Sequence, residues 1–414
     1  YPILSGLVGS EMCIRDSTRG MLSGVKVLDL TNVLAGPFCC HQLAHMGAEV
    51  IKIETVGRGD LARQLGASKN LNSQLMGISF LAQNAGKKSL TINLKSQKGK
   101  EIFLKLVKVS DVVVENFRPG VMKRLGLEYD YLKKINSKLI YCSISGFGQT
   151  GPMSKRPAYD QIIQGLSGLM SITGRDGDGP LRVGSPLADT VGGLTAAMAI
   201  SAALNKRPRG QAIDVAMLDS LLTTMGWVVS NYLIGGVIPT QQGNENMTSA
   251  PSGTFQTGDG LLNISANEEK QWKALVHHLG CEHLSNDKRF ITRDNRKKYR
   301  KELKIELEKF LSKKTAIKWE EELIEIGVPT GIVMSVPDIL AHPQIMHRDL
   351  LETFDTKNHH NEKITVMRTG FRVNNEPTNV NSPPPSIGEH NNKILRELGY
   401  TEYEISEFKK TKVI

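Results

Sequence analysis

The segment PLADTVGG, residues 186–193, combines residue types and a spacing that suit chemistry. Asp189 stands where an extended segment leads into a helix, and Gly192 and Gly193 behind it leave room for a bulky ligand. A carboxylate is ionised at neutral pH, and the free N–H groups of a helix N-terminus stabilise an oxyanion. The alternative is that Asp189 only caps the helix, because Asp is a favoured N-cap residue. On spacing alone we favour the cap.

Other motifs that carry chemistry are incomplete. His41 and His45 have the i, i+4 spacing of a metal-binding helix, but Gln42 stands where the HExxH motif has Glu. The GKKS of residues 86–89 lacks the first glycine of a P-loop, and the DGDG of residues 176–179 lacks the spaced ligands of a calcium loop. We therefore predict no metal site and no permanently bound cofactor.

The elements that position these residues alternate between strands and helices. Helical patterns lie between the apolar strand patterns, at residues 34–47 and 97–110. The strand patterns cover residues 24–31, 48–54, 87–94, 111–117 and 138–148. This βαβ alternation predicts an α/β fold with a Rossmann-like parallel sheet that binds ligands at the carboxyl ends of its strands.

Changes in composition divide the chain into domains. Residues 1–20 lack an initiator Met and the basic start of a signal peptide, and we interpret them as a non-native leader. We expect a large Rossmann-like domain over residues 21–234 and a smaller α+β domain over residues 235–345. In the smaller domain, residues 272–279 and 301–326 each have the pattern of an amphipathic helix. We expect residues 346–414 to return to the large domain.

The charge and cysteine content narrow the classes of partner. A formal net charge of +10 favours an anionic partner. The densest basic stretch, residues 288–304, has no interleaved stacking aromatics, so we expect a small phosphorylated molecule and no nucleic acid. Five cysteines without CxxC spacing indicate neither disulfides nor a zinc site. No run of about 20 apolar residues predicts a membrane span, and we expect a cytoplasmic protein.

The order of motifs resembles that of CoA-transferase family III, also called the CaiB/BaiF family, across residues 22–414. The segments that carry the resemblance are LSGVKVLDLTNVLAGPF, GKKSLTINLK, VVENFRPGVMKRLGL, YCSISGFGQTGP, RPAYDQIIQGLSGLM, PLADTVGG, RGQAIDVAM, RFITRDNR, GVPTGIV and PPPSIGEH. The resemblance implies a transferase that moves coenzyme A between carboxylic acids, with acyl-CoA and small carboxylic acids as its partners. It makes Asp189 the nucleophile and thereby reverses the preference for a helix cap. It also implies a homodimer of interlocked chains.

The family pattern further implies which residues meet the coenzyme A thioester, a substrate rather than a bound cofactor. They lie in the large domain, which becomes the CoA-binding domain: Val33, Leu34, Ala35, Ile92, Asn93, Lys95, Asn116, Phe117, Arg124, Tyr159 and Asp160. Each of four residues also has a purely structural interpretation. Asn116 and Phe117 can be a strand end packed under a loop, Tyr159 a half-buried core aromatic, and Asp160 a capping residue.

Two departures from the family pattern concern binding. Thr55 stands where some relatives have an Arg that could contact the adenine or a phosphate of CoA. We expect Arg58 or Arg63 to make that contact instead. The Met247–Ser249 run replaces a run of glycines found in formyl-CoA transferases, which argues against a formyl or oxalate enzyme.

Tyr159 separates acyl transfer from racemisation. The α-methylacyl-CoA racemases, which resemble this segment, have His at that position, and a phenol is too weak a base to replace an imidazole near neutral pH. We therefore expect a transferase, with the racemase as the alternative. For the acyl pair, the chain most resembles family members that use succinyl-CoA with a dicarboxylate such as glutarate, and carnitine, mesaconate and other acids are the alternatives. Arg156, Arg175 and Arg182 are candidates for binding its second carboxylate, with a solvated loop surface as the other interpretation.

Overall fold

A computed structural model describes residues 20–356 and 363–414, and most of the proposed leader lies outside these ranges. The chain divides into two compact units. Unit 1 contains the residues up to Ser167 together with Val183–Ser230 and Met346–Ile414, and unit 2 contains Gly168–Arg182 and Asn231–Ile345. The segment between Ser167 and Asp189 is therefore divided between the units: residues 168–182 belong to unit 2, and the residues from Val183 onward belong to unit 1.

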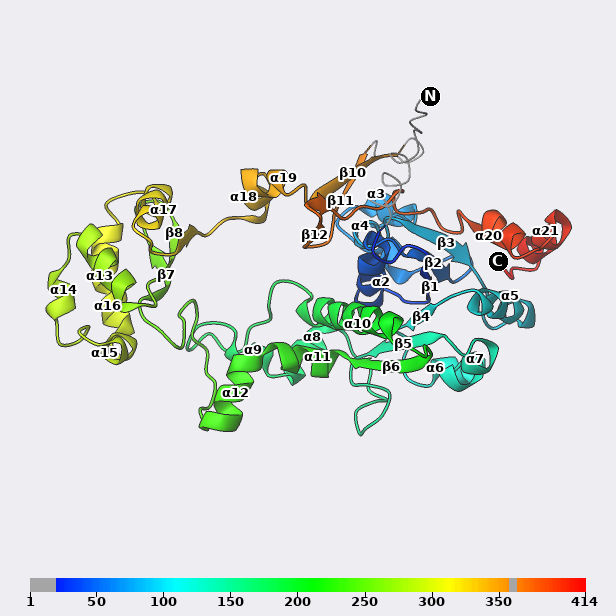
Figure 1. Ribbon diagram of the computed structural model, residues 1–414, viewed down its shortest axis with the longest axis horizontal. Coiled ribbons are helices and arrows are strands. Elements are labelled where there is room, and N and C mark those ends of the chain that lie inside the picture. The colour runs from blue at the N-terminus through cyan, green and yellow to red at the C-terminus, as the bar shows by residue number, and fades with distance from the viewer. Residues whose placement is uncertain (1–19, 357–362) are drawn as a thin grey trace, which may run out of the picture. The chain divides into compact units, whose positions relative to one another are not determined.

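Unit 1 is built on a six-stranded parallel sheet with the strand order β3-β2-β1-β4-β5-β6 (Figure 1). Its strands are β1 (Lys26–Asp29), β2 (Glu49–Glu54), β3 (Lys87–Thr91), β4 (Val112–Glu115), β5 (Ile140–Ser145) and β6 (Gln211–Ala216). The central strands are continuous apolar runs such as Val112–Val114, all with no exposed surface, as expected of a sheet covered on both faces. The α/β class and the parallel sheet predicted from the sequence are confirmed.

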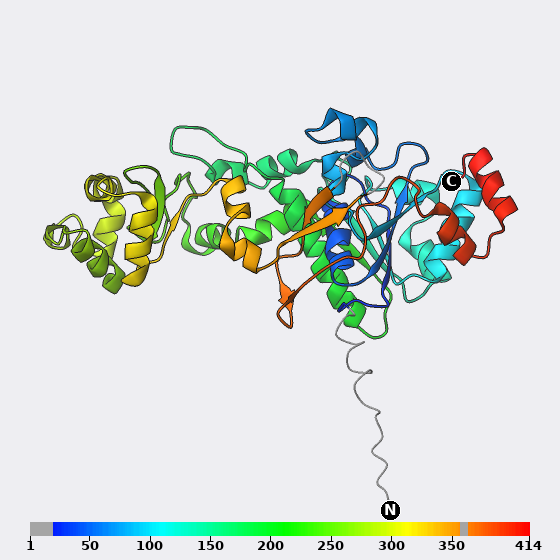
Figure 2. The ribbon, with the colours of Figure 1, turned by 90° about the horizontal axis from the view of Figure 1, so that it is seen from above.

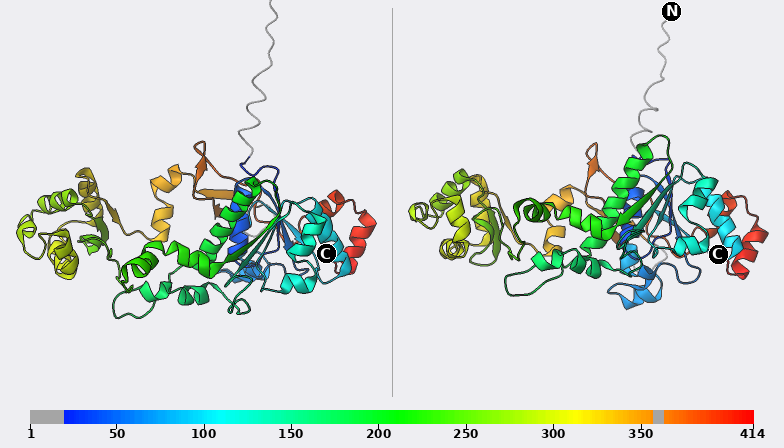
Figure 3. Two further views of the ribbon diagram at one scale, coloured as in Figure 1. Left: turned by 60° about the horizontal axis from the view of Figure 1, so that its bottom comes forward. Right: turned by 90° about the horizontal axis from the view of Figure 1, so that it is seen from below.

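Helices cover both faces of this sheet (Figure 3). One face carries α2 (Ala35–His45) and α10 (Leu187–Asn205), which pack against each other. A Cβ at Gly193 would lie 2.5 Å from the carbonyl oxygen of Ala35, so only glycine allows α10 to approach α2 this closely. The space beside Gly193, expected to admit a ligand, is therefore filled by a neighbouring helix.

The opposite face is covered by α5 (Gln97–Lys108), α6 (Val121–Leu125) and α7 (Tyr129–Ile135), together with the C-terminal helices α20 (Asn391–Glu397) and α21 (Glu402–Lys410) (Figure 2). Leu28, Ile51 and Val113 of the sheet share one hydrophobic cluster with Phe103 of α5 and Leu395 of α20. The last residues of the chain thus belong to the core of unit 1.

The end of the segment before α20, together with the first residue of that helix, satisfies the free edge of β3. Ser89 N donates to His390 Nδ1 at 3.2 Å, and Thr91 N donates to Asn391 Oδ1 at 2.9 Å. His390 N in turn donates to the carbonyl oxygen of Ser89 at 3.0 Å. Because an open strand edge invites pairing with other chains, His390 at the end of the PPPSIGEH segment and Asn391 directly after it block edge-to-edge association.

Helix α10 also meets the length and composition criteria of a membrane-spanning helix, with 19 residues and a mean hydropathy of 1.5. It carries Asp189 in its first turn and packs against α2, α8 (Asp160–Leu166), α11 (Met217–Thr224), β5 and β6. These contacts bury one side of the helix, including Ala188, Ala196 and Ile200, inside unit 1.

Unit 2 contains an antiparallel sheet of β7 (Ser252–Gln256), β8 (Leu261–Ser265) and β9 (Thr330–Ile332) with helices packed on it. These helices are α13 (Glu269–His278), α14 (His283–Asn286), α15 (Arg293–Lys298), α16 (Arg300–Leu311) and α17 (Ala316–Glu325). The single helix predicted over residues 301–326 is wrong. The chain breaks after Leu311, and the Thr315 hydroxyl accepts a hydrogen bond from Lys318 N to start a new helix.

The remaining elements are short connections. The helices are η1 (Leu61–Gln64), α3 (Lys69–Ser73), α4 (Ile78–Leu81), α9 (Leu169–Ile172), α12 (Gly226–Gly235), α18 (Val336–Leu340) and α19 (Pro343–His347). The strands are the hairpin β10 (Leu351–Asp355) with β11 (Lys363–Met367), and β12 (Arg372–Val373) with β13 (Glu376–Pro377).

Candidate active site

A pocket of ≈ 280 Å³ opens in unit 1 at the carboxyl edge of the sheet. The loops that follow β1, β4 and β5 form its walls, and the first turns of α10 and α11 contribute Asp189 and Met217. The lining residues are Asn32, Val33, Leu34, Ala35, Asn116, Phe117, Arg118, Pro119, Ile144, Ser145, Gly146, Ser154, Arg156, Pro157, Ala158, Tyr159, Asp189 and Met217. Parallel sheets place ligand sites at this edge.

Asp189 is the only carboxylate among the residues that line this pocket. It is half-buried at the third position of α10. Its oxygens form no hydrogen bond or ion pair within residues 20–356 and 363–414. Since the helix begins after Pro186 without a side-chain cap from its own segment, the interpretation of Asp189 as a cap is wrong. The carboxylate is free to react with a ligand.

The N-terminus of α10 is bonded instead by Asp160, the first residue of α8. Asp160 Oδ1 accepts hydrogen bonds from Ala188 N at 2.8 Å and from Asp189 N at 3.4 Å. Its Oδ2 accepts from Gln164 Nε2 at 2.7 Å, and the same amide donates to the carbonyl oxygen of Ser185 at 3.1 Å. Asp160 is buried and does not line the pocket. It therefore caps the N-terminus of α10, and the structure does not place it among the residues that would contact CoA.

The surroundings of Asp189 change its acidity. Burial raises the pKa of its carboxyl from the ordinary 3.8 to about 7, and the nearby negative charge of Asp160 adds to the rise. The carboxylate is therefore a stronger base and a stronger nucleophile than an exposed aspartate. Its protonation changes near neutral pH.

The structure brings seven of the predicted site residues together in the pocket: Val33, Leu34, Ala35, Asn116, Phe117, Tyr159 and Asp189. It places five elsewhere in unit 1: Ile92, Asn93, Lys95, Arg124 and Asp160. Ile92 is buried in the core, Lys95 and Arg124 are exposed, and Asn93 accepts a hydrogen bond from Lys95 N. The loop after β3 reaches the same sheet edge as the pocket, but β2 and β3 lie beyond β1, away from β4 and β5.

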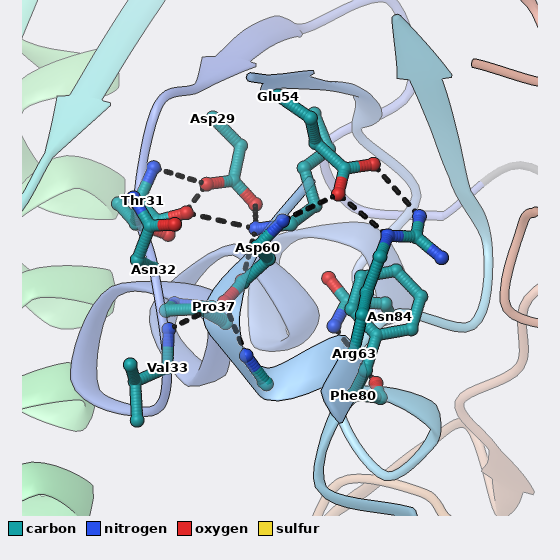
Figure 4. A network of polar contacts seen from close by, with 12 residues as sticks. Asp29, Thr31, Asn32, Val33, Pro37, Glu54, Asp60, Arg63, Phe80 and Asn84 are labelled. Carbon is teal, nitrogen blue, oxygen red and sulfur yellow. Dashed lines mark hydrogen bonds and ion pairs between the residues drawn. The ribbon is translucent and has the colours of Figure 1, made fainter. Parts of the chain in front are cut away.

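Arg63 does not take over the contact expected of an Arg at position 55. Its guanidinium is fully buried, with 2.7 Å hydrogen bonds from Nε and Nη2 to the Glu54 carboxylate (Figure 4). It also donates to the carbonyl oxygen of Pro385 and stacks 3.6 Å from the ring centre of Phe80. Because its donors are used inside the protein, the expectation for Arg63 is wrong, while Arg58 is exposed.

Sequence reasoning did not place Arg118 in the site, and Arg156 was only one of three candidate arginines. Both side chains line the pocket, and neither guanidinium forms an ion pair or side-chain hydrogen bond in the described part of the chain. Arg118 follows the asparagine and phenylalanine of ENFRPG directly after β4, so the rule that ligands meet strand ends was a usable signal. Two unpaired cations give the pocket a preference for anionic ligands.

The described residues contain no group of three His, Cys, Asp or Glu side chains arranged to hold a metal ion. His41 and His45 are buried on α2 with their ring centres 4.3 Å apart. An open parallel sheet carries at its carboxyl edge one carboxylate and two guanidinium groups that have no partner among the described residues. This arrangement defines an α/β enzyme with a site for an anionic substrate.

Comparison with known proteins identifies the family. The family model of CoA-transferase family III matches residues 22–391. The chain is 36% identical over 388 residues to a succinate–glutarate CoA-transferase of Agrobacterium fabrum, covering 91% of this chain and 95% of that one. It is 40% identical over 337 residues to an acetyl-CoA:oxalate CoA-transferase of Acetobacter aceti, covering 80% and 86%. The chain belongs to CoA-transferase family III.

The fold agrees with a solved member of the same group. The crystal structure of a CaiB/BaiF family protein from Brucella suis matches with a TM-score of 0.80 and 34% identity, covering 92% of this chain and all of that one. The resemblance inferred from the sequence motifs is confirmed. The protein is a CoA-transferase, an enzyme that moves coenzyme A from an acyl-CoA to a carboxylic acid.

Proposed function

We propose that the protein transfers CoA from succinyl-CoA to a second dicarboxylic acid through covalent intermediates on Asp189. The observation that carries the mechanism is the carboxylate of Asp189, which lies in a pocket at the carboxyl edge of the sheet and has no partner in the part of the chain that the structure describes. Burial keeps this carboxylate poorly solvated, which favours its attack on an electrophile.

Four steps balance the exchange. An Asp189 oxygen attacks the thioester carbonyl, which forms a mixed anhydride and releases the CoA thiolate. The thiolate attacks the aspartyl carbonyl of the anhydride, which releases the donor acid and leaves CoA on Asp189 as a thioester. The acceptor carboxylate attacks this thioester and forms a new anhydride. The thiolate then attacks the acceptor carbonyl, which gives the product thioester and restores Asp189.

The charge of the pocket supports a dicarboxylate. One carboxylate of the acceptor reacts, and a second negative charge needs a cation to replace its water. Arg118 and Arg156 line the same pocket as Asp189 and have no ion-pair partner in the described residues. The Agrobacterium relative, with 36% identity, is a succinate–glutarate CoA-transferase and acts on a pair of dicarboxylates. Arg156 is our candidate for the second carboxylate, and Arg118 for a phosphate of CoA.

Transfer is measured by incubating the protein with succinyl-CoA and a panel of monocarboxylic and dicarboxylic acids. We expect new acyl-CoA species, detected by mass spectrometry, with glutarate and similar dicarboxylates at least about tenfold ahead of monocarboxylates of equal length, because one charge pair contributes about 1.4 kcal/mol. Deuterium exchange at the α-carbon of a branched acyl-CoA without any new thioester would instead show the racemase activity. Equal rates for both acid classes would contradict the substrate class.

We also propose that the chain forms a homodimer. In unit 1, α10 exposes Leu194 and Met198, with 47% and 68% of their surfaces accessible. In unit 2, Leu233, Ile234 and Ile238 are 72%, 88% and 76% exposed. Exposed apolar side chains that gather on a surface indicate a contact with another chain, and a second copy of this protein is the partner we propose.

Light scattering tests the dimer directly. We expect the mass of two chains, about 91 kDa from the chain mass of 45.6 kDa. Ile234→Lys should shift this mass toward one chain, because it buries a charge in the contact. A mass of one chain for the unchanged protein at micromolar concentration would contradict the proposal.

A further inference from the structure

The turn that forms one wall of the pocket has an unusual backbone. Val33 lies between β1 and α2 with φ at 68°, in the left-handed region. A β-branched residue is strained in this region and persists there only where surrounding contacts hold it. Val33, Leu34 and Ala35 all line the pocket, so the strained residue begins the segment that meets a ligand.

Side chains from other elements hold the backbone on both sides of this residue. Asp60 Oδ1 accepts a hydrogen bond from Val33 N at 2.9 Å. The Asn116 amide bonds twice to the preceding residue: its Oδ1 accepts from Asn32 N and its Nδ2 donates to the carbonyl oxygen of Asn32, both at 2.8 Å. The peptide groups around Val33 are thus held by two side chains that are distant in the sequence.

Asp60 is itself held by a buried charge network (Figure 4). Its Oδ2 pairs with Lys52 Nζ at 2.9 Å, and Lys52 also donates to the carbonyl oxygen of Thr31 at 2.9 Å. Asp29 accepts from Thr31 N at 2.9 Å and pairs with Lys87. All four charged side chains are at most 1% exposed, and the partners lower the pKa of Asp29 and Asp60 despite burial. The anchor for the turn is therefore fixed and ionised.

The contacts of Asn116 change its expected role. The resemblance made it a residue that binds CoA, yet both heteroatoms of its amide are engaged by the backbone of Asn32. Asp60 does not line the pocket at all. Neither side chain needs to touch the ligand to influence how the pocket binds it.

We propose that Asp60 and Asn116 are positioning residues, which hold the strained turn at Val33 so that the segment Val33–Ala35 presents its backbone to the acyl-CoA. This inference rests on the proposed function, in that the pocket is taken to bind acyl-CoA. When either contact is lost, Val33 relaxes toward negative φ and the wall of the pocket moves. Acyl-CoA affinity falls, while the chemistry of Asp189 on bound substrate changes little.

The chain contains a matched control for Asn116. Asn136 also uses its amide to hold backbone, donating from Nδ2 to the carbonyl oxygens of Val107 and Ser110 at 3.0 and 2.8 Å. It lies after α7 and does not line the pocket. Asn136→Ala therefore removes a comparable side-chain support at a site without contact to the ligand.

The experiment compares Asn116→Ala and Asn136→Ala by thermal unfolding, by steady-state kinetics and by calorimetric binding of free CoA. We expect both to lower Tm by similar amounts, because each loses hydrogen bonds to backbone. Only Asn116→Ala should raise the KM for acyl-CoA and the Kd for CoA, by about tenfold, with kcat within about threefold. Unchanged KM in Asn116→Ala, or an equal rise in Asn136→Ala, overturns the proposal.

Asp60→Asn separates positioning from direct contact. It keeps the side-chain shape, but its amide places a donor against either Lys52 or Val33 N. Since Asp60 does not reach the pocket, we expect Asp60→Asn to raise the KM for acyl-CoA as much as Asn116→Ala does. The KM of the variant that combines both changes should be at most about twice that of either single variant, because both changes act on one turn. An effect of Asn116→Ala that is absent from Asp60→Asn, or that adds fully to it, overturns the proposal. If the unchanged protein binds no CoA, the proposed function fails instead.

Discussion

Replacing Asp189 by Asn should abolish CoA exchange and leave CoA binding intact. The amide cannot form the anhydride, so we expect the exchange rate to fall by at least about 10⁴-fold, the scale seen when a covalent nucleophile is removed. The Kd for free CoA should change by less than about threefold, because the variant keeps the shape of the pocket. Exchange is measured by mass spectrometry with succinyl-CoA and glutarate, and binding by calorimetry. Hydroxylamine should trap the acyl group only on the unchanged protein.

A matched control is available in the next helix. Asp219 occupies the third position of α11, as Asp189 does in α10, but it is exposed and does not line the pocket. Asp219→Asn removes the same favourable charge from a helix N-terminus and should leave exchange within about twofold. Full activity of the Asp189→Asn protein, or equal losses in both variants, would exclude Asp189 as the nucleophile.

The Asp189→Asn variant should also be more stable than the unchanged protein at pH 8. Folding raises the pKa of this carboxyl to about 7, so the folded state favours the protonated form. Its destabilising effect is absent below the ordinary pKa of 3.8, grows as pH rises, and is complete above the raised pKa. A neutral amide does not experience that effect, and a higher Tm at pH 8 but not at pH 4 would show it. The comparison also demonstrates that the inactive variant is folded.

The sequence predicts the sheet well because its strands are buried on both faces. Segments such as Val112–Val114 are continuous apolar runs of the length of a strand, which is the pattern of a parallel sheet covered on both faces. The single helix predicted over residues 301–326 is wrong, although the sequence contains a local signal for the break. Thr315 is an N-cap residue inside an otherwise continuous helical pattern. The amphipathic period continues across the break and conceals it.

The roles of Asp160 and Asn116 were less accessible, for a physical reason. Asp160 bonds to Ala188 N, 28 positions along the chain, and Asn116 bonds to Asn32, 84 positions away. A family pattern marks such residues as part of a site, but it does not say whether they touch the ligand or support the backbone that does. That distinction depends on tertiary hydrogen bonds, which spacing does not encode.

The acid limb of the pH profile should report the ionisation of Asp189. The nucleophile must be the carboxylate, and burial together with Asp160 raises its pKa to about 7 in the free enzyme. We therefore expect kcat/KM to be level above this pKa and to fall about tenfold per pH unit below it, so that about 1% of the activity remains at pH 5. Rates measured between pH 5 and pH 9 with a saturating acceptor test this directly. A flat profile down to pH 5 would contradict the raised pKa.

Two variants assign this limb to its residue. Asp160→Asn removes the neighbouring negative charge, so the midpoint should move to lower pH, but only in part, because burial is the larger cause of the shift. Glu115 is the competing source, since burial also raises its pKa to about 7 and its Oε2 accepts from Phe117 N at 2.8 Å next to the pocket. Glu115→Gln should leave the midpoint in place. If the midpoint instead moves in Glu115→Gln and not in Asp160→Asn, the acid limb reports the ionisation of Glu115 and not that of the nucleophile.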